Sequence, residues 1–163
     1  MLYLALKKED VGIHGITTGI IKRCLREPYA HSELIFPDGK SFSASGWDNR
    51  VRFKQINYSH PQWWDFYHLP YVSIRDLNLI HQKAKAIDGC KYDFRGVFYW
   101  FIIKNKFKQD MNRWWCFEAC SWALGQYPYR VSGVPMLEKA IERGAVKVSA
   151  PYPVILQKGP HAN

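Results

Sequence analysis

The sequence lacks a hydrophobic run long enough to cross a membrane and lacks a recognisable export leader. Its longest purely apolar run covers residues 97–103, seven residues against the ~20 that span a bilayer. The first ten residues have neither a basic leader nor the apolar length of a signal peptide. We therefore expect no transmembrane segment, synthesis in the cytoplasm, and delivery to the cell envelope only by another system.

The sequence has few cysteines, and its acidic residues are fewer than its basic residues. Four cysteines are few for a secreted disulfide scaffold, so we expect reduced thiols. Fourteen Asp and Glu against 23 Lys and Arg give a net charge of +9, which would help the chain approach nucleic acid, anionic lipid or an acidic wall polymer without choosing among them. The sequence contains no run of five like charges and no RNA- or DNA-binding motif, so we do not expect nucleic acid as a partner.

The usual sequence patterns of a metal or nucleotide cofactor are also missing. Cys116 and Cys120 form a Cys-x-x-x-Cys pair, but no second ligand pair follows at the spacing of a zinc site. Gly12 and Gly15 lack the glycine spacing and the lysine of a phosphate-binding loop. We therefore predict no metal and no cofactor.

Aromatic residues, by contrast, are abundant, and the hydrophobic period changes partway along the chain. Aromatics make up 16% of the residues, enough for a large core or an apolar groove. The first half predicts a helix over residues 12–27 and strands over residues 2–6, 29–36, 40–45, 51–56 and 65–69, with a hairpin turn at Asp38-Gly39. The second half predicts helices over residues 73–88, 94–103, 115–124 and 136–143 and an extended segment over 146–154. This order predicts an α+β fold in a single domain over residues 1–163, with a small antiparallel sheet first and a helical half after it.

Cys116 is the best candidate for a nucleophile. It lies at the start of the helix predicted over residues 115–124, where free backbone N–H groups and the helix dipole stabilise a thiolate. Cys120 lies one turn further along among apolar residues, and we expect it to be a small core residue.

His31 is the best candidate for the general base, because it lies within a predicted strand. Strand alternation places Glu33 on the same face as His31. If the hairpin pairs Phe36 with Lys40, Ser43 lies opposite Glu33 on that face. Either residue can orient the imidazole, and a one-residue slip would move Ser43 to the other face, so both remain candidates.

Five segments carry a family resemblance: PYAHSELIF at residues 28–36, FSAS at 42–45, VRF at 51–53, GCKYDFRG at 89–96 and WWCFEAC at 114–120. They resemble the circularly permuted, YiiX-like branch of the NlpC-type papain-like cysteine hydrolases, which is distantly similar to the lecithin retinol acyltransferases. In this branch, which includes bacterial and phage-borne proteins, the strands that carry the base precede the cysteine helix. The resemblance covers roughly residues 13–125 and implies a papain-like fold with permuted order.

Position by position, the resemblance makes Cys116 the nucleophile and His31 the general base. Relatives often carry the third polar residue on the strand after the histidine, which corresponds to Ser43 here. Many have Glu at that position, and because serine orients an imidazole less strongly, Glu33 is a credible substitute.

Three further residues are candidates for substrate binding. Tyr92 is placed to donate to the oxyanion or to shape the pocket. Phe117 stands where relatives often have Ser, and we expect it to change the pocket wall. Trp115 belongs to a Trp-Trp pair that would line an apolar pocket next to Cys116.

The implied activity is that of a cysteine hydrolase, a peptidase, amidase or acyl hydrolase that cleaves an amide or ester bond through a thioester. Cell-wall peptide, that is peptidoglycan, fits the wider superfamily, whereas an acyl or lipid substrate fits the permuted branch and the aromatic content. The alternative is an inactive papain-like module that binds lipid, cell wall or a protein partner.

Overall fold

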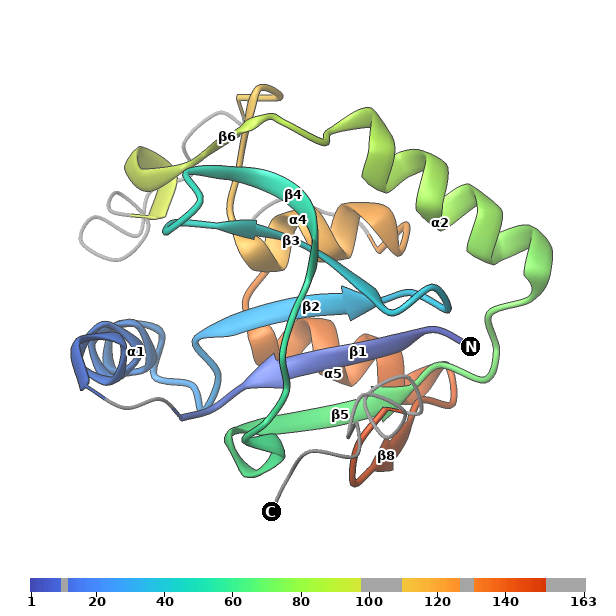
Figure 1. Ribbon diagram of the computed structural model, residues 1–163, viewed down its shortest axis with the longest axis horizontal. Coiled ribbons are helices and arrows are strands. Elements are labelled where there is room, and N and C mark those ends of the chain that lie inside the picture. The colour runs from blue at the N-terminus through green and yellow to red at the C-terminus, as the bar shows by residue number, and fades with distance from the viewer. Residues whose placement is uncertain (10–11, 98–109, 127–130, 152–163) are drawn as a thin grey trace, which may run out of the picture.

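Eight strands form one curved sheet in the computed structural model, which describes residues 1–9, 12–97, 110–126 and 131–151. The spatial order is β7-β6-β4-β3-β2-β1-β5-β8, and neighbours are antiparallel except for β6 and β7 (Figure 1). The bounds are β1 Tyr3–Lys7, β2 His31–Ile35, β3 Lys40–Ser45, β4 Arg50–Gln55, β5 Trp64–His68, β6 Lys91–Tyr92, β7 Arg113–Trp114 and β8 Val146–Val148.

The helices are distributed unevenly around this sheet. They are α1 Gly12–Leu25, α2 Ile74–Ala86, α4 Cys116–Ala123 and α5 Gly133–Glu142, with a 3₁₀ turn at Pro61–Trp63 and helical residues at 94–97. Helix α4 packs on β2, β3 and α2, while α1 lies at the far side of the molecule from α2 (Figure 1). Strands and helices thus pack together as an α+β fold. Within the described ranges, no helix has the length and apolar character needed to span a bilayer.

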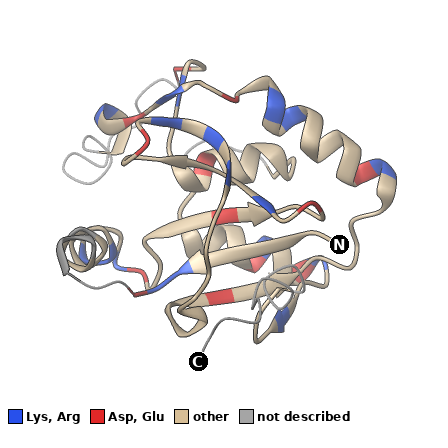
Figure 2. Cartoon of the chain, viewed as in Figure 1, with Lys and Arg blue, Asp and Glu red and all other residues tan. Residues whose placement is uncertain are grey.

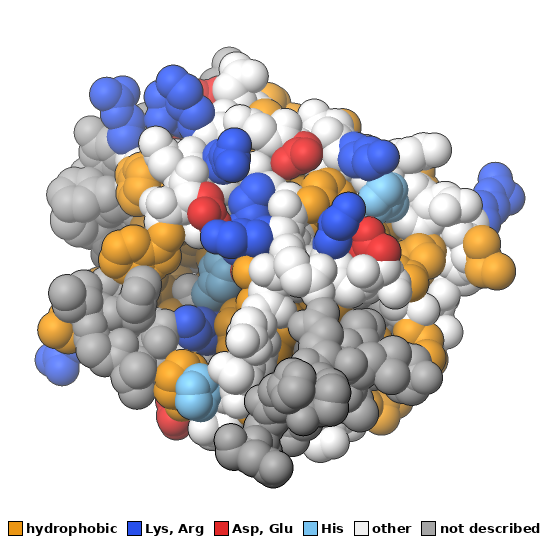
Figure 3. Space-filling model, in the orientation of Figure 1, with side chains coloured by type: hydrophobic (Ala, Val, Ile, Leu, Met, Phe, Trp, Pro, Cys, Tyr) orange, Lys and Arg blue, Asp and Glu red, His pale blue; other side chains and the backbone are white. Residues whose placement is uncertain are grey.

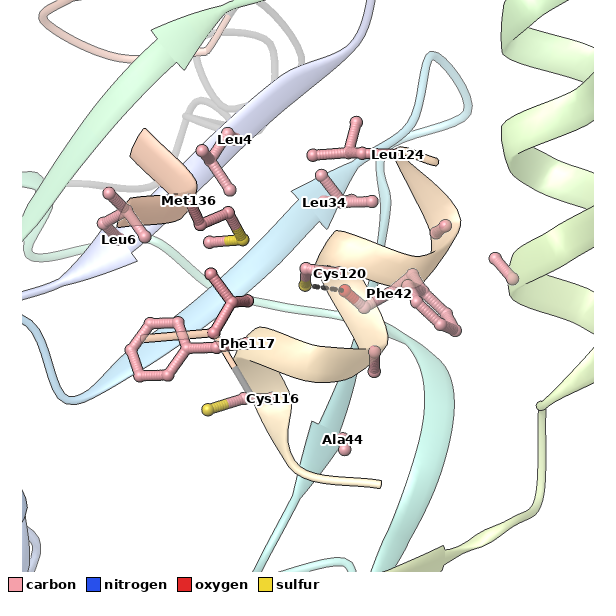
Figure 4. Close-up of a cluster of buried hydrophobic side chains, with 14 of the residues drawn as sticks. Leu4, Leu6, Leu34, Phe42, Ala44, Cys116, Phe117, Cys120, Leu124 and Met136 are labelled. Atoms are coloured by element: carbon pink, nitrogen blue, oxygen red, sulfur yellow. Dashed lines mark hydrogen bonds between the residues drawn. The ribbon is translucent and has the colours of Figure 1, made fainter. Parts of the chain in front are cut away.

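Side chains pack on both faces of the sheet because neighbouring strand residues point to opposite sides. On the face covered by α4 and α5, the core includes Leu4, Leu6, Leu34, Phe42, Phe117 and Met136 (Figure 4). A smaller cluster on the opposite face consists of Tyr3, Ala5, Ile35, Tyr58 and Phe66. The sheet therefore separates a large apolar core from a second face that carries polar residues as well.

The β2–β3 hairpin has the predicted register. The Phe36 N–H donates to the Lys40 carbonyl at 2.9 Å, and Ile35 lies opposite Ser41. Gly39 supplies the positive φ of 81° that the turn requires, and the Asp38 carboxylate accepts from the Lys40 N–H at 3.0 Å. The prediction of a hairpin at Asp38-Gly39 is confirmed.

The predicted start and end of α2 are also confirmed. The Ser73 hydroxyl accepts from the Asp76 N–H at 3.1 Å, and the Asp76 carboxylate accepts from the Ser73 N–H at 3.3 Å. This reciprocal capping satisfies two N–H groups at the start of the helix. Gly89 has a φ of 83°, a conformation that ends the helical segment at little steric cost.

Other boundaries differ from those predicted. The short strands β6 and β7 were not predicted, because two-residue strands carry no periodic signal. The helix predicted over 94–103 is helical at 94–97, and its remainder lies outside the described residues. The extended segment predicted over 146–154 forms β8 over its first three residues. Residues 152–154 lie outside the described residues.

Helix α1 leaves part of its apolar surface exposed. Ile16 and Ile20 are 65% and 57% exposed, while Ile21 and Leu25 are partly buried. The helix lies at the side of the sheet rather than over it, so only part of its surface meets the protein (Figure 1).

Helix α5 begins at Gly133, three residues earlier than predicted, because a distant carboxylate caps it. The Ser132 hydroxyl and the Val134 N–H both donate to the Glu27 carboxylate, the latter at 3.0 Å. Negative charge at this end of a helix also complements the helix dipole. Glu27 thus ties the segment after α1 to α5.

We expect Glu27→Gln to lower the free energy of unfolding by about 1–2 kcal/mol, because it weakens two hydrogen bonds to a charged acceptor at a helix start. Urea unfolding followed by circular dichroism measures this change. Glu138→Gln, an exposed substitution on the same helix, is the control and should change stability little. Equal losses in both variants would contradict the capping role.

Candidate active site

Cys116 is the first residue of α4. Trp115 precedes it in extended conformation, and the Ala119 N–H donates to the Trp115 carbonyl at 2.9 Å as the helix begins. The N–H groups of the first turn, including that of Cys116, therefore lie before the i→i−4 ladder and point out of the helix end. Cys116 is only 2% exposed, so its thiol is shielded from solvent.

His31 begins β2 and contacts both Cys116 and Glu33. Its Nε2 lies 2.8 Å from Oε1 of Glu33, and the ring also interacts with the side chain of Cys116. Burial by itself lowers the pKa of His31, but the charge and hydrogen bond of Cys116, together with those of Glu33, outweigh burial and raise this pKa to about 9. The imidazole is consequently held in its protonated form at neutral pH.

Glu33 is in turn held by Arg52 on β4. The guanidinium donates from Nη1 to Oε2 at 3.0 Å and from Nη2 to Oε1 at 2.9 Å. Burial alone would raise the pKa of Glu33, whereas the hydrogen bond from His31 and the positive charge of Arg52 lower it to about 2. The carboxylate is therefore ionised although its side chain is only 2% exposed. Figure 2 shows this acidic position in the middle of β2 and the basic residues along β4.

The sequence left Ser43 and Glu33 as alternatives for the residue that orients His31. The Ser43 hydroxyl donates to the Ser32 carbonyl at 2.6 Å, whereas Glu33 contacts the imidazole directly. The predicted face is right for both residues, but only Glu33 has a side chain long enough to reach along the strand. We assign the orienting contact to Glu33.

A cavity of about 610 Å³ opens beside His31, and Cys116 is not among the residues that line it. His31, Glu33, Arg52 and Tyr92 line it from strands β2, β4 and β6. Its apolar walls include Ile21, Ile56, Trp64 and Phe94, and the cations Lys7 and Lys54 also border it. The space-filling view shows basic side chains gathered over β4, with hydrophobic side chains beside them (Figure 3).

Of the three predicted substrate-binding residues, Tyr92 borders this cavity. Trp115 and Phe117 do not, which corrects our expectation that they form the pocket wall. Both are buried in the core with ring centroids 5.5 Å apart. Phe117 packs against Gly133, where an added Cβ would lie 3.1 Å from the ring, so its side chain fills space between α4 and α5.

Cys120 differs from Cys116 as the sequence suggested. Its Sγ lies 3.6 Å from the Ser32 carbonyl and 3.7 Å from that of Phe42 (Figure 4). Burial raises the pKa of the Cys120 thiol, which keeps it neutral.

Arg52 and Asp48 were missed by the sequence analysis. Arg52 lies within the VRF segment used for the family resemblance, but its contact with Glu33 depends on the β3–β4 register. Asp48 accepts from Nε of Arg52 at 3.1 Å and extends the same network. Among the residues that the structure describes, no group of three or more His, Cys, Asp or Glu side chains is arranged to hold a metal ion.

Comparisons with known proteins show similarity to a solved structure but to no family model. No protein-family model matches the sequence, and no curated protein matches it significantly. Among solved structures, the metalloprotein YiiX from Escherichia coli O157:H7 is similar, with a TM-score of 0.52 and 16% sequence identity. The alignment covers 94% of this chain and 89% of YiiX. At this identity the match shows a shared fold only.

The contacts of His31 suggest a mutational test of which residue, Glu33 or Ser43, orients its imidazole. We expect Glu33→Gln to lower the pKa of His31 from about 9 toward the ordinary value of about 6.5, because the favourable charge on Glu33 is removed. NMR titration of the imidazole protons measures this pKa. Ser43→Ala should leave it unchanged, and a comparable fall in that variant would assign the orienting role to Ser43.

Proposed function

We propose that this protein is a cysteine hydrolase that cleaves an amide or ester bond through a thioester intermediate. The supporting observation is the chain of contacts from Cys116 at a helix start to His31 and on to a buried, ionised Glu33. This is the arrangement that an activated thiol nucleophile requires, with a base beside the thiol and a third group that fixes the base. The fold shared with YiiX is consistent with the papain-like, permuted family that the sequence resembles.

In the first half of the proposed reaction, Cys116 and His31 act as a thiolate–imidazolium pair. The thiolate attacks the substrate carbonyl, and a tetrahedral intermediate forms. His31 then donates its proton to the leaving amine or alcohol, and the C–N or C–O bond breaks to leave an acyl thioester on Cys116.

In the second half, neutral His31 takes a proton from a water molecule. The resulting hydroxide attacks the thioester, the C–S bond breaks, and the free acid leaves. The thiolate and the imidazolium are thereby restored, so protons balance over the cycle.

The negative oxygen of the intermediate needs hydrogen-bond donors. The N–H of Cys116 at the start of α4 is one, because the helix end leaves it available. Tyr92 is the second candidate, since it borders the cavity together with His31 and lies near Cys116. Burial and the neighbouring Cys116 keep the pKa of Tyr92 well above its ordinary value, so its hydroxyl stays a donor.

The cavity meets the candidate site at His31 and Tyr92 rather than at Cys116, and we propose that it holds the acyl part of the substrate. Aromatic and aliphatic side chains form much of its wall, while Lys7 and Lys54 at its border suit an anionic or polar group. Fatty-acyl esters or amides and cell-wall peptides remain the two substrate classes to compare. YiiX is described as a metalloprotein, but the side chains described around Cys116 form no ligand set for a metal, and we derive no step through one.

Replacement of the nucleophile tests the proposal. We expect Cys116→Ala to abolish hydrolysis of p-nitrophenyl esters of short and long acyl chains, or of peptide amides, with a loss of stability no larger than that of Cys120→Ala, because both thiols are buried. Cys120→Ala is the matched control on the same helix. It should retain activity and lose about 1 kcal/mol of stability, because it removes a fully buried sulfur.

Alkylation with iodoacetamide, followed by mass spectrometry, tests the thiol without knowledge of the substrate. Cys116 should react faster than Cys24, Cys90 and Cys120, the internal controls, and more slowly in His31→Ala than in the wild type. Ordinary or absent reactivity at Cys116 would favour a binding module that has the fold without turnover.

A further inference from the structure

Arg52 contacts the candidate catalytic group through Glu33 without being part of that group itself. We propose that Arg52 is a positioning residue that fixes the Glu33 carboxylate against His31. This inference rests on the proposed function for its consequence in catalysis, but its structural part can be tested without any substrate.

The geometry of the contact is specific to an arginine. Two nitrogens of the guanidinium donate to the two oxygens of Glu33 at 2.9 and 3.0 Å, which fixes both the position and the plane of the carboxylate. Oε1 of Glu33 also accepts from His31, so one oxygen joins the cation to the imidazole. A lysine at this position would supply the charge but not the paired donors.

The contact spans three strands and depends on a small residue in the middle one. Ser43 lies opposite Arg52 in the β3–β4 register. When the β2–β3 register is continued by one residue from Leu34–Phe42, Glu33 lies opposite Ser43. The Ser43 hydroxyl is drawn to the Ser32 carbonyl, and its short side chain lets Arg52 and Glu33 meet across β3. The small side chain of Ser43 thus permits the long-range pair.

Arg52 is itself held in place. Its Nε donates to Asp48 in the β3–β4 turn at 3.1 Å, and Lys54 donates to the other oxygen of Asp48 at 3.1 Å. The Arg52 side chain is only 8% exposed. The guanidinium is therefore fixed at both ends, between the turn and the carboxylate.

The charges that face Glu33 explain why a permanent cation is needed there. Among the described residues, the cationic groups hydrogen-bonded to Glu33 are His31 and Arg52. The other titratable groups near it are Tyr58 and Cys120, whose pKa values burial raises, and Cys116 beyond the imidazole. In the proposed cycle His31 loses its proton to the leaving group. Arg52 then keeps Glu33 ionised and ready to accept from the imidazole when it is protonated again.

Arg52→Met removes the paired donors while keeping a long side chain. We expect the titration midpoint of Glu33, followed by NMR of ¹³C-labelled glutamate and assigned with Glu33→Gln, to move upward in this variant. Alkylation of Cys116 at neutral pH should slow, and kcat/KM should fall roughly 10- to 100-fold, which lies within the range of coupling between contacting residues. Arg50→Met, an exposed substitution two residues away on β4, should leave all three measurements unchanged.

Two further variants separate positioning from a general structural effect. Arg52→Lys should restore part of the Glu33 titration and part of the activity, because it returns the charge without the fork. In a Glu33→Gln background, Arg52→Met should cause little further loss of activity, because Arg52 acts through Glu33. If Arg52→Met fails to fold, the Arg52→Lys comparison still measures the effect of the lost paired contact.

The inference is overturned if Glu33 titrates and Cys116 reacts alike in the wild type, Arg52→Met and Arg52→Lys. It is also overturned if the loss in the double variant equals the sum of the two single losses. Absence of turnover in the wild type, by contrast, counts against the proposed function alone, because the Glu33 titration and the alkylation profile need no substrate.

Discussion

A buried carboxylate is the constraint around which this sheet is arranged. Removing an isolated charge from water costs several kcal/mol, so Glu33 is tolerated in β2 only because cations meet it inside the protein. Arg52 comes from β4, two strands away, and this places strict demands on the order and register of β2, β3 and β4. His31 approaches from the same strand as Glu33 and completes the compensation. The contacts among His31, Glu33 and Arg52 are thus a requirement of the folded sheet, independent of any reaction.

The two faces of the sheet carry different kinds of residue: one packs in the apolar core, and the other carries polar residues of the candidate site. Helix α4 covers one face with apolar residues such as Phe117 and carries Cys120 into the core, where burial keeps that thiol neutral. One turn earlier, Cys116 lies at the helix end and meets His31. The same residue type on the same helix therefore has two environments, set by a displacement of about 6 Å along the helix axis. That difference separates a core cysteine from a candidate nucleophile.

Local signals in the sequence predict local features of this fold well. The Asp38-Gly39 turn and the Ser73–Asp76 cap involve residues close together in the chain, and both are present. Features that depend on tertiary packing were not predictable in this way. Phe117 points into the core because Gly133, distant in sequence, leaves room for its ring. Arg52 likewise reaches Glu33 only when two strand registers are correct, and a single sequence does not fix both.

The same distinction applies within the candidate site. His31 and Glu33 are two residues apart on one strand, so their side chains share a face and their Cα atoms lie about 6.6 Å apart whatever the neighbouring strands do. The base and its acceptor are consequently a local unit that tolerates a change of register. The charge of Glu33 is compensated by a long-range unit, which consists of Arg52, Asp48 and the β3–β4 turn. This unit does not tolerate a change of register. A fold that moves the orienting group onto the base strand gains independence from the hairpin register, but it then needs a cation from beyond that hairpin to keep the buried carboxylate ionised.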